Sequence, residues 1–112
     1  MKRRLRRHCF IAFDVFGDST GFRFSASNGV EDKIQGDEIS LKREVRLTAN
    51  SPVTSRIVLL KDGRAVQDET GIKLKQFTVS EKGSYRVEVY LPQLGTPVAD
   101  QPWIISNPIY VR

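Results

Sequence analysis

The stretch GSYRVEVYL, residues 83 to 91, alternates apolar and polar side chains along its whole length. Tyr85, Val87, Val89 and Leu91 fall on one side, and the residues between them are charged or polar. A period of two is the pattern of a β-strand that buries one face. Such a strand needs a second apolar layer to pack against, so this stretch already predicts a fold of at least two layers.

The same period recurs upstream. In GFRFSAS, residues 21 to 27, and in EVRLTA, residues 44 to 49, every second side chain is apolar. The residues expected to point inward are Phe22, Phe24, Ala26, Val45, Leu47 and Ala49. Asp62-Gly63 lies between two apolar runs and predicts a two-residue hairpin turn, because both residue types tolerate positive φ.

Three further features concern irregular backbone. The apolar positions shift by one residue between Leu74 and Phe77, which predicts a β-bulge at Lys75 or Gln76. The triplet Asn50-Ser51-Pro52 predicts a turn. Two polar segments, residues 27 to 40 and 92 to 101, are expected to form long loops.

The last eleven residues, PWIISNPIYVR, are too apolar for a free tail. Their β-branched and aromatic side chains predict a final strand that packs against the sheet. Pro108 cannot donate a hydrogen bond to a neighbouring strand. The strand is therefore expected to lie on an edge, or to carry a bulge at this position.

The strand count is about seven or eight, with almost no helical periodicity after residue 9, which predicts an all-β, antiparallel β-sandwich. Residues 1 to 8 are expected to be a basic helical stub or tail, because Leu5 and Cys9 are one helical repeat apart. Residues 9 to 112 form the predicted sandwich. Within it, residues 9 to 40 supply lead-in strands and a loop, and residues 41 to 112 supply the main body.

Charge is distributed unevenly along the chain. The net charge is +5, and the first seven residues alone carry five basic side chains. The remaining residues carry thirteen basic and thirteen acidic side chains, so the body is neutral and no nucleic-acid partner is expected. No apolar run approaches the roughly 20 residues that span a bilayer, so no membrane partner is expected. The single cysteine, Cys9, demands no oxidising compartment, and a cytoplasmic location is favoured.

The sequence offers few residues with catalytic chemistry. His8 is the only histidine, and no spacing of histidine, cysteine and acidic residues forms a metal set. Asp14 interrupts the apolar run CFIAFDVF; it is either a site residue or a strand-end acid that pairs with Arg23 or caps a turn. The acidic residues Glu31, Asp32, Asp37 and Glu38 fit a solvated loop better than a calcium loop. We therefore expect no catalytic residue, no metal and no cofactor.

Residues 81 to 87, EKGSYRV, resemble the acidic-x-Gly-x-Tyr-x-Cys stretch of immunoglobulin-like strands. In those domains the tyrosine hydroxyl bonds back to the main chain at a corner. Val87 stands where antibody domains have cysteine. The resemblance is therefore to immunoglobulin-like modules in general, and it implies a tyrosine corner at Tyr85.

Three longer phrases are similar to the C-terminal portion of bacterial PHP-domain metal-dependent phosphoesterases. They are LRRHCFIAFDVFGDSTGFRFSAS, the GDEI stretch at residues 36 to 39, and GSYRVEVY followed by PWIISNPIYVR. In that family a metal-binding barrel precedes an immunoglobulin-like module. The family's metal ligands lie in the barrel, upstream of these phrases, so no catalytic residue carries over to this chain.

The resemblance implies a non-catalytic accessory domain that packs against or positions a hydrolase. The partner would be the hydrolase domain of the parent protein or a separate protein. The alternative is a free-standing β-sandwich that binds protein or carbohydrate; a small phosphoesterase is a third reading. Residues 9 to 16 are also expected to expose an apolar patch through which the chain self-associates. The interface candidates are Phe10, Phe13, Phe16, Tyr90 and Trp103.

Overall fold

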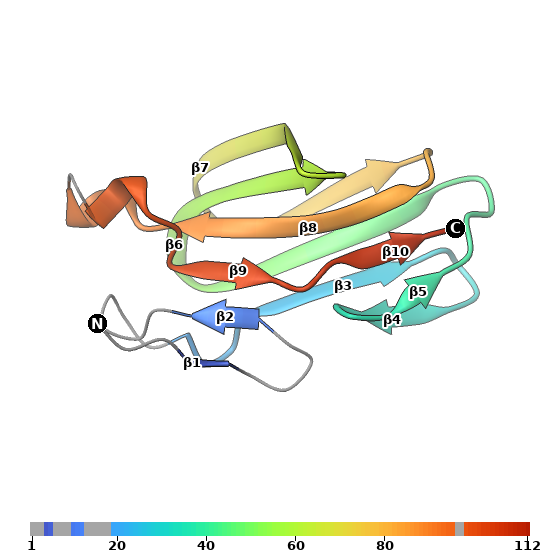
Figure 1. Ribbon diagram of the computed structural model, residues 1–112, viewed down its shortest axis with the longest axis horizontal. Coiled ribbons are helices and arrows are strands. Elements are labelled where there is room, and N and C mark those ends of the chain that lie inside the picture. The colour runs from blue at the N-terminus through green and yellow to red at the C-terminus, as the bar shows by residue number, and fades with distance from the viewer. Residues whose placement is uncertain (1–3, 6–9, 13–18, 96–97) are drawn as a thin grey trace.

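The computed structural model describes residues 4–5, 10–12, 19–95 and 98–112, with side chains described from Ser19 onward except at Val98. These residues form ten strands and two single 3₁₀ turns, in one mixed sheet that curls nearly into a barrel (Figure 1). The strands are β1 (Arg4–Leu5), β2 (Phe10–Ala12), β3 (Arg23–Ser27), β4 (Asp32–Ile34), β5 (Glu38–Ile39), β6 (Val45–Lys61), β7 (Arg64–Val79), β8 (Gly83–Tyr90), β9 (Ile104–Ser106) and β10 (Ile109–Val111). The 3₁₀ turns are η2 (Pro92–Leu94) and η3 (Val98–Asp100). Among the described residues, no helix has the length and apolar content needed to cross a membrane. The all-β prediction is confirmed.

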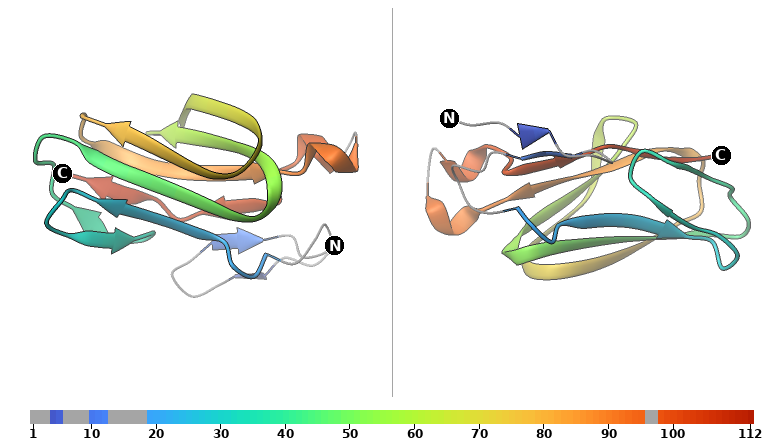
Figure 2. Two further views of the ribbon diagram at one scale, coloured as in Figure 1. Left: turned by 180° about the vertical axis from the view of Figure 1, so that it is seen from behind. Right: turned by 90° about the horizontal axis from the view of Figure 1, so that it is seen from below.

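Strand β6 connects the two layers of the fold. Residues 46 to 50 pair with β3, and Arg56–Lys61 pair with β8. Figure 2 shows the consequence: β3 and the first half of β6 lie in one layer, and β8, β9 and β10 lie in the other. The apolar faces of both layers therefore meet in a single core.

Strand β6 bends where it leaves the first layer. Its register with β7 jumps between Asn50 and Ser55, and both Ser51 and Ser55 are buried there. The Ser55 hydroxyl lies 3.0 Å from the Ser51 hydroxyl, and Ser51 donates to the carbonyl of Val53 at 2.8 Å. These bonds replace the ladder bonds that the bend removes.

The bend corrects two predictions. The triplet at residues 50 to 52 does not reverse the chain, because β6 continues through it with its polar groups bonded to buried serines. The predicted bulge at Lys75 or Gln76 is wrong, since the register with β6 is unbroken from Leu74 to Val79. The irregularity lies just before Leu74, and it leaves that side chain 57% exposed.

The hairpin between β6 and β7 is confirmed. Asp62 and Gly63 have φ of 51° and 86°, and Lys61 pairs with Arg64 across the turn. The turn is also tied to β8, because the Asp62 amide donates to the Ser84 carbonyl at 2.8 Å and the Asp62 carboxylate accepts from the Ser84 amide at 2.9 Å.

The core contains the alternating positions that the sequence indicates. The predicted inward residues are buried: Phe22, Phe24, Ala26, Val45, Leu47, Ala49, Tyr85, Val87, Val89 and Leu91. The Tyr85 hydroxyl donates to the Glu81 carbonyl at 2.9 Å, which is the bond expected of a tyrosine corner.

The closing segment is part of the core. It forms two strands instead of one, since Asn107 and Pro108 lie between β9 and β10. Trp103 is 1% exposed, and Ile104, Ile109 and Val111 are buried with it. Because the break falls at Pro108, neither strand needs the amide that proline lacks.

The expected loop over residues 27 to 40 is partly wrong, because it contains β4 and β5. Strand β5 runs parallel to β10, with Glu38 beside Tyr110 and Ile39 beside Val111. Ile39 is 1% exposed. A two-residue strand with one apolar side chain has no periodicity to detect, so only its long-range partner reveals it.

The N-terminal segment differs from the expected helix. Arg4 and Leu5 form β1, an antiparallel strand beside Ala12 and Ile11 of β2. Strand β2 in turn pairs with β9, which agrees with a lead-in strand in residues 9 to 16. The remaining residues of the predicted stub lie outside the described residues, as do His8, Cys9, Asp14, Phe13 and Phe16.

Candidate interaction surface

A row of charged and aromatic side chains crosses the outer face of β7, β6 and β8. Its members are Asp68, Arg56, Tyr90, Glu88 and Arg86, and we call them the tyrosine–arginine row. Arg56 lies directly opposite Tyr90 in the β6–β8 ladder. Arg86, Glu88 and Tyr90 alternate with the buried residues of β8, so all three point away from the core.

Each member of the row contacts the next. Arg56 donates to both oxygens of Asp68, from Nε at 2.9 Å and from Nη2 at 2.6 Å. Its Cζ lies 5.0 Å from the centroid of the Tyr90 ring. The Tyr90 hydroxyl donates to Glu88 Oε1 at 2.8 Å, and Arg86 Nη1 donates to Glu88 Oε2 at 2.8 Å. The row is thus a continuous chain of bidentate, cation–π and charge-assisted contacts.

Two apolar residues lie on the same face. Val58 is opposite Asp68 and Glu88, and Leu60 is opposite Arg86. They are 5% and 7% exposed although they point away from the main core. Long polar side chains can cover apolar surface with their stems. The row therefore shields a small outer apolar patch and keeps its charged ends at the surface.

These contacts and partial burial shift the pKa values of three side chains in the row. Partial burial raises the pKa of Tyr90 to about 12, and the hydrogen bond to Glu88 and the charge of that carboxylate add to the rise. The hydrogen bond between Arg56 and Asp68 raises the pKa of Arg56 and lowers the pKa of Asp68. Arg56 and Asp68 therefore stay charged, and Tyr90 stays neutral, across neutral pH.

We expect Glu88→Gln to move the titration of Tyr90 to lower pH, because the variant removes the carboxylate that opposes phenolate formation. The measurement is ultraviolet absorbance against pH, with Tyr90→Phe subtracted to isolate this tyrosine. The raised pKa stabilises the folded state below the ordinary tyrosine value near 10, and this contribution is lost as pH rises through about 12. An unchanged Tyr90 titration in Glu88→Gln would show that the carboxylate has no influence on it.

The row is a candidate contact surface for another protein. Its acids and its arginines are bonded to one another. Tyrosine and arginine are the residue types enriched at interface centres. Within the described part of the chain, no group of three or more His, Cys, Asp or Glu side chains is placed to hold a metal ion.

The predicted interface residues have different outcomes. Tyr90 belongs to the row and is partly exposed. Trp103 is buried by the two layers, so it cannot serve as an exposed platform. Phe10 lies in β2 with its main chain beside Ser106, and its side chain is outside the described set. Phe13 and Phe16 lie outside the described residues, so self-association through residues 9 to 16 stays a prediction.

The sequence did not reveal Arg56 or Asp68 as members of a site. The outward positions of β8 can be read from its alternation. The contribution of β6 and β7 depends on register, and register depends here on a bend and two further irregularities. No local pattern of residues reports those irregularities.

Comparison with known proteins identified no matching family model, no matching curated protein and no matching solved structure.

Proposed function

We propose that this chain is a non-catalytic immunoglobulin-like accessory module of a bacterial PHP-type metal-dependent phosphoesterase, and that it packs against or positions the hydrolase. The proposal rests on a resemblance between phrases of sequence. One structural observation supports it most: two phrases that carry the resemblance, GDEI and the closing SNPIYV, lie side by side although some 70 residues separate them.

The contacts between these two phrases are specific. The Gly36 amide donates to the Pro108 carbonyl at 2.8 Å, and the Oε1 atom of Gln35, the residue before GDEI, accepts from the Asn107 amide at 3.0 Å. The Tyr110 amide then donates to the Asp37 carbonyl at 3.0 Å. A similarity carried by two phrases that build one local structure is more informative than two unconnected matches would be.

The immunoglobulin-like part of the proposal has two supports. Tyr85 makes the corner bond to Glu81, and the two layers face each other across a core of alternating residues. The strand β6 that crosses between layers also occurs in partly closed barrels. Because of the Tyr85 bond and the two facing layers, we propose a sandwich as the closer description of this all-β fold.

The tyrosine–arginine row is the proposed contact with the hydrolase. It belongs to the same layer as β9, and β9 pairs with the N-terminal strand β2. In a longer protein of this family, a hydrolase domain preceding residue 1 would be tethered at the edge of that layer. Tethering raises the effective concentration of two surfaces, so a modest contact suffices to hold them together.

The first test of this proposal is the nucleotide sequence upstream of the chain's own gene segment. The reading frame upstream of the Met1 codon is expected to encode a histidine-rich barrel. In the joined protein, Arg56→Ala and Tyr90→Ala should lower the melting temperature of the hydrolase domain, whereas Lys73→Ala, on the exposed edge of β7, should leave it unchanged.

Two results would contradict the proposal. One is a frame that holds no hydrolase next to this module. The other is turnover of bis(4-nitrophenyl) phosphate by this chain alone with Mn²⁺ or Zn²⁺, abolished by a chelator, because that would make the chain an enzyme in its own right.

The alternative function is a free-standing module that binds protein through the same row. The observation that favours it is that the row is already assembled through internal bonds, so binding would not have to order these side chains. The carbohydrate version is weaker, because sugar binding needs an exposed aromatic surface and Trp103 is buried.

A further inference from the structure

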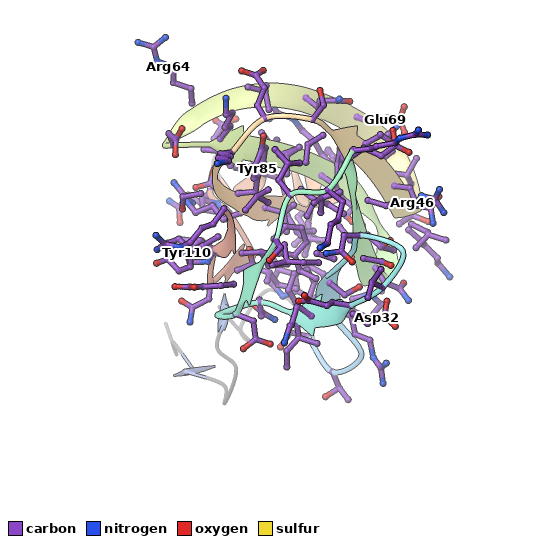
Figure 3. All side chains as sticks on the ribbon, turned by 90° about the vertical axis from the view of Figure 1, so that its right-hand side faces the viewer. Asp32, Arg46, Arg64, Glu69, Tyr85 and Tyr110 are labelled. Atoms are coloured by element: carbon purple, nitrogen blue, oxygen red, sulfur yellow. The ribbon has the colours of Figure 1, made fainter. Side chains whose placement is uncertain are left out.

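A shallow hollow of about 450 Å³ lies at the end of the fold where β8 begins and β10 ends. Lys82, Gly83, Tyr110, Val111 and Arg112 line it. Figure 3 shows Tyr110 on the opposite side of the molecule from Arg46, pointing away from the core. The hollow is within the size range of small-molecule sites. It is separate from the tyrosine–arginine row and does not depend on the proposed function.

Arg112 is held in place on several sides. Its amide donates to the Ile39 carbonyl at 3.0 Å, and its carbonyl accepts from the Leu41 amide at 2.8 Å. The side chain contacts Glu38 Oε1 through Nε at 3.2 Å, and its Cζ lies 5.5 Å from the centroid of the Tyr110 ring. The main-chain bonds fix the position of Arg112, and its exposed guanidinium lies with Nε beside Glu38, while the two terminal nitrogens make no bond within the described part of the chain.

Two more donors around the hollow are unused. Lys82 is exposed and forms no ion pair with any described residue, and the Tyr110 hydroxyl has no hydrogen-bond partner among them. Gly83 forms part of the lining without a side chain. A Cβ added at Gly83 would lie 3.0 Å from Lys61 Cε, so a larger residue there would displace the Lys61 side chain.

Three acidic groups near the hollow are each engaged. Glu38 faces Arg112, and Glu81, which precedes Lys82, lies 3.3 Å from Lys61 Nζ. The Asp62 carboxylate, on the side of Gly83, accepts from the Ser84 amide at 2.9 Å. The hollow therefore gathers an ammonium group, a guanidinium fork and a phenol, and all three offer hydrogen atoms. The ligand that matches this set is an oxyanion with more than one acceptor oxygen.

We propose that the hollow between Lys82 and Arg112 binds a doubly charged oxyanion, a phosphate group free or carried by a small ester. A phosphate group offers three acceptor oxygens to these three donors, whereas a carboxylate such as acetate offers two. The Tyr110 hydroxyl supplies a third hydrogen bond, and the open side of the hollow leaves room for the remainder of an ester.

The experiment is a titration of the whole chain followed by amide chemical shifts in nuclear magnetic resonance. The probes are inorganic phosphate, phenyl phosphate and acetate, at ionic strength held constant with sodium chloride. We expect saturable shifts at Gly83, Tyr110 and Val111 with both phosphates, and at least tenfold weaker binding of acetate. Equal affinities for the two phosphates would indicate a site for the free ion, and tighter binding of phenyl phosphate a site for an ester.

Matched variants test the residues. Lys82→Gln and Arg112→Gln are each expected to weaken phosphate binding about tenfold, and Tyr110→Phe to weaken it severalfold. Lys73→Gln, which removes an exposed lysine from β7, should leave it unchanged. Binding should also weaken below pH 6, where phosphate gains a proton.

The proposal fails if the shifts rise linearly without saturation, if acetate binds as tightly as phosphate, or if Lys73→Gln weakens binding as much as Lys82→Gln. A folded Arg112→Gln protein that binds phosphate normally would also contradict it.

Discussion

Trp103→Ala is expected to lower the free energy of unfolding by about 3–5 kcal/mol, the range for deleting a large buried aromatic side chain. Trp103 is 1% exposed and packs within the core cluster that joins the two layers. Its amide also donates to the Val89 carbonyl at 2.7 Å, which fixes the start of the closing segment to the end of β8. The loss combines removed apolar contacts with a cavity that neighbouring strands cannot close.

Urea unfolding followed by far-ultraviolet circular dichroism measures this change. Leu94→Ala is the matched control, because Leu94 is 46% exposed in η2 and its truncation should change stability by no more than about 0.5 kcal/mol. If Trp103→Ala unfolded at the same urea concentration as the parent chain, the tryptophan would not be a core residue. The hypothesis that Trp103 is a surface platform for sugar binding would then have to be reconsidered.

Ile109→Ala is expected to cost about 2–5 kcal/mol. Ile109 is fully buried and lies opposite Tyr85, the residue of the tyrosine corner. Strand β10 is the element that joins β5 to β8, so weakening it removes support from both neighbours. The effect should therefore reach the β5 region, although that region is distant in sequence.

Ile34→Ala provides the control for this second change, since Ile34 is 43% exposed in the edge strand β4. Both substitutions remove the same atoms from a strand, and only the burial differs. Equal destabilisation by the two would contradict the placement of the closing segment in the core. Thermal unfolding of both variants at one protein concentration makes the comparison direct.

The burial of side chains can be predicted from the sequence where one face of a strand is apolar. The alternation in residues 83 to 91 predicted four buried side chains, and all four are buried. The turn at Asp62 and Gly63 was equally readable, because positive φ restricts the residue types that can occupy it. These features are local, and local chemistry determines them.

Features that depend on distant partners were missed. Strand β5 exists because Ile39 pairs beside Val111, and the bend in β6 exists because Ser51 and Ser55 replace ladder bonds inside the fold. The short strand β1 was expected to be helical, since Leu5 and Cys9 have helical spacing. Pairing with β2 overrides that local preference at Arg4 and Leu5.

The candidate sites show the same division between features set by local sequence and features set by distant partners. Tyr90 was identified from its outward position, whereas Arg56 and Asp68 join it only through cross-strand register. The hollow at Lys82 and Arg112 combines residues from β10 and the turn before β8, so no contiguous motif marks it. Trp103 was an interface candidate of the alternative binding module, and it is buried in the core.

Hydrogen exchange tests the central claim most directly, which is that the closing segment locks the two layers together. We expect the amides of Trp103 and Tyr110, bonded to Val89 and Asp37, to exchange as slowly as the bonded amides of the central strand β6. All of them should open only with global unfolding. Rapid exchange at Trp103 and Tyr110, with β6 still protected, would show that the segment is attached loosely and would contradict its role in locking the layers.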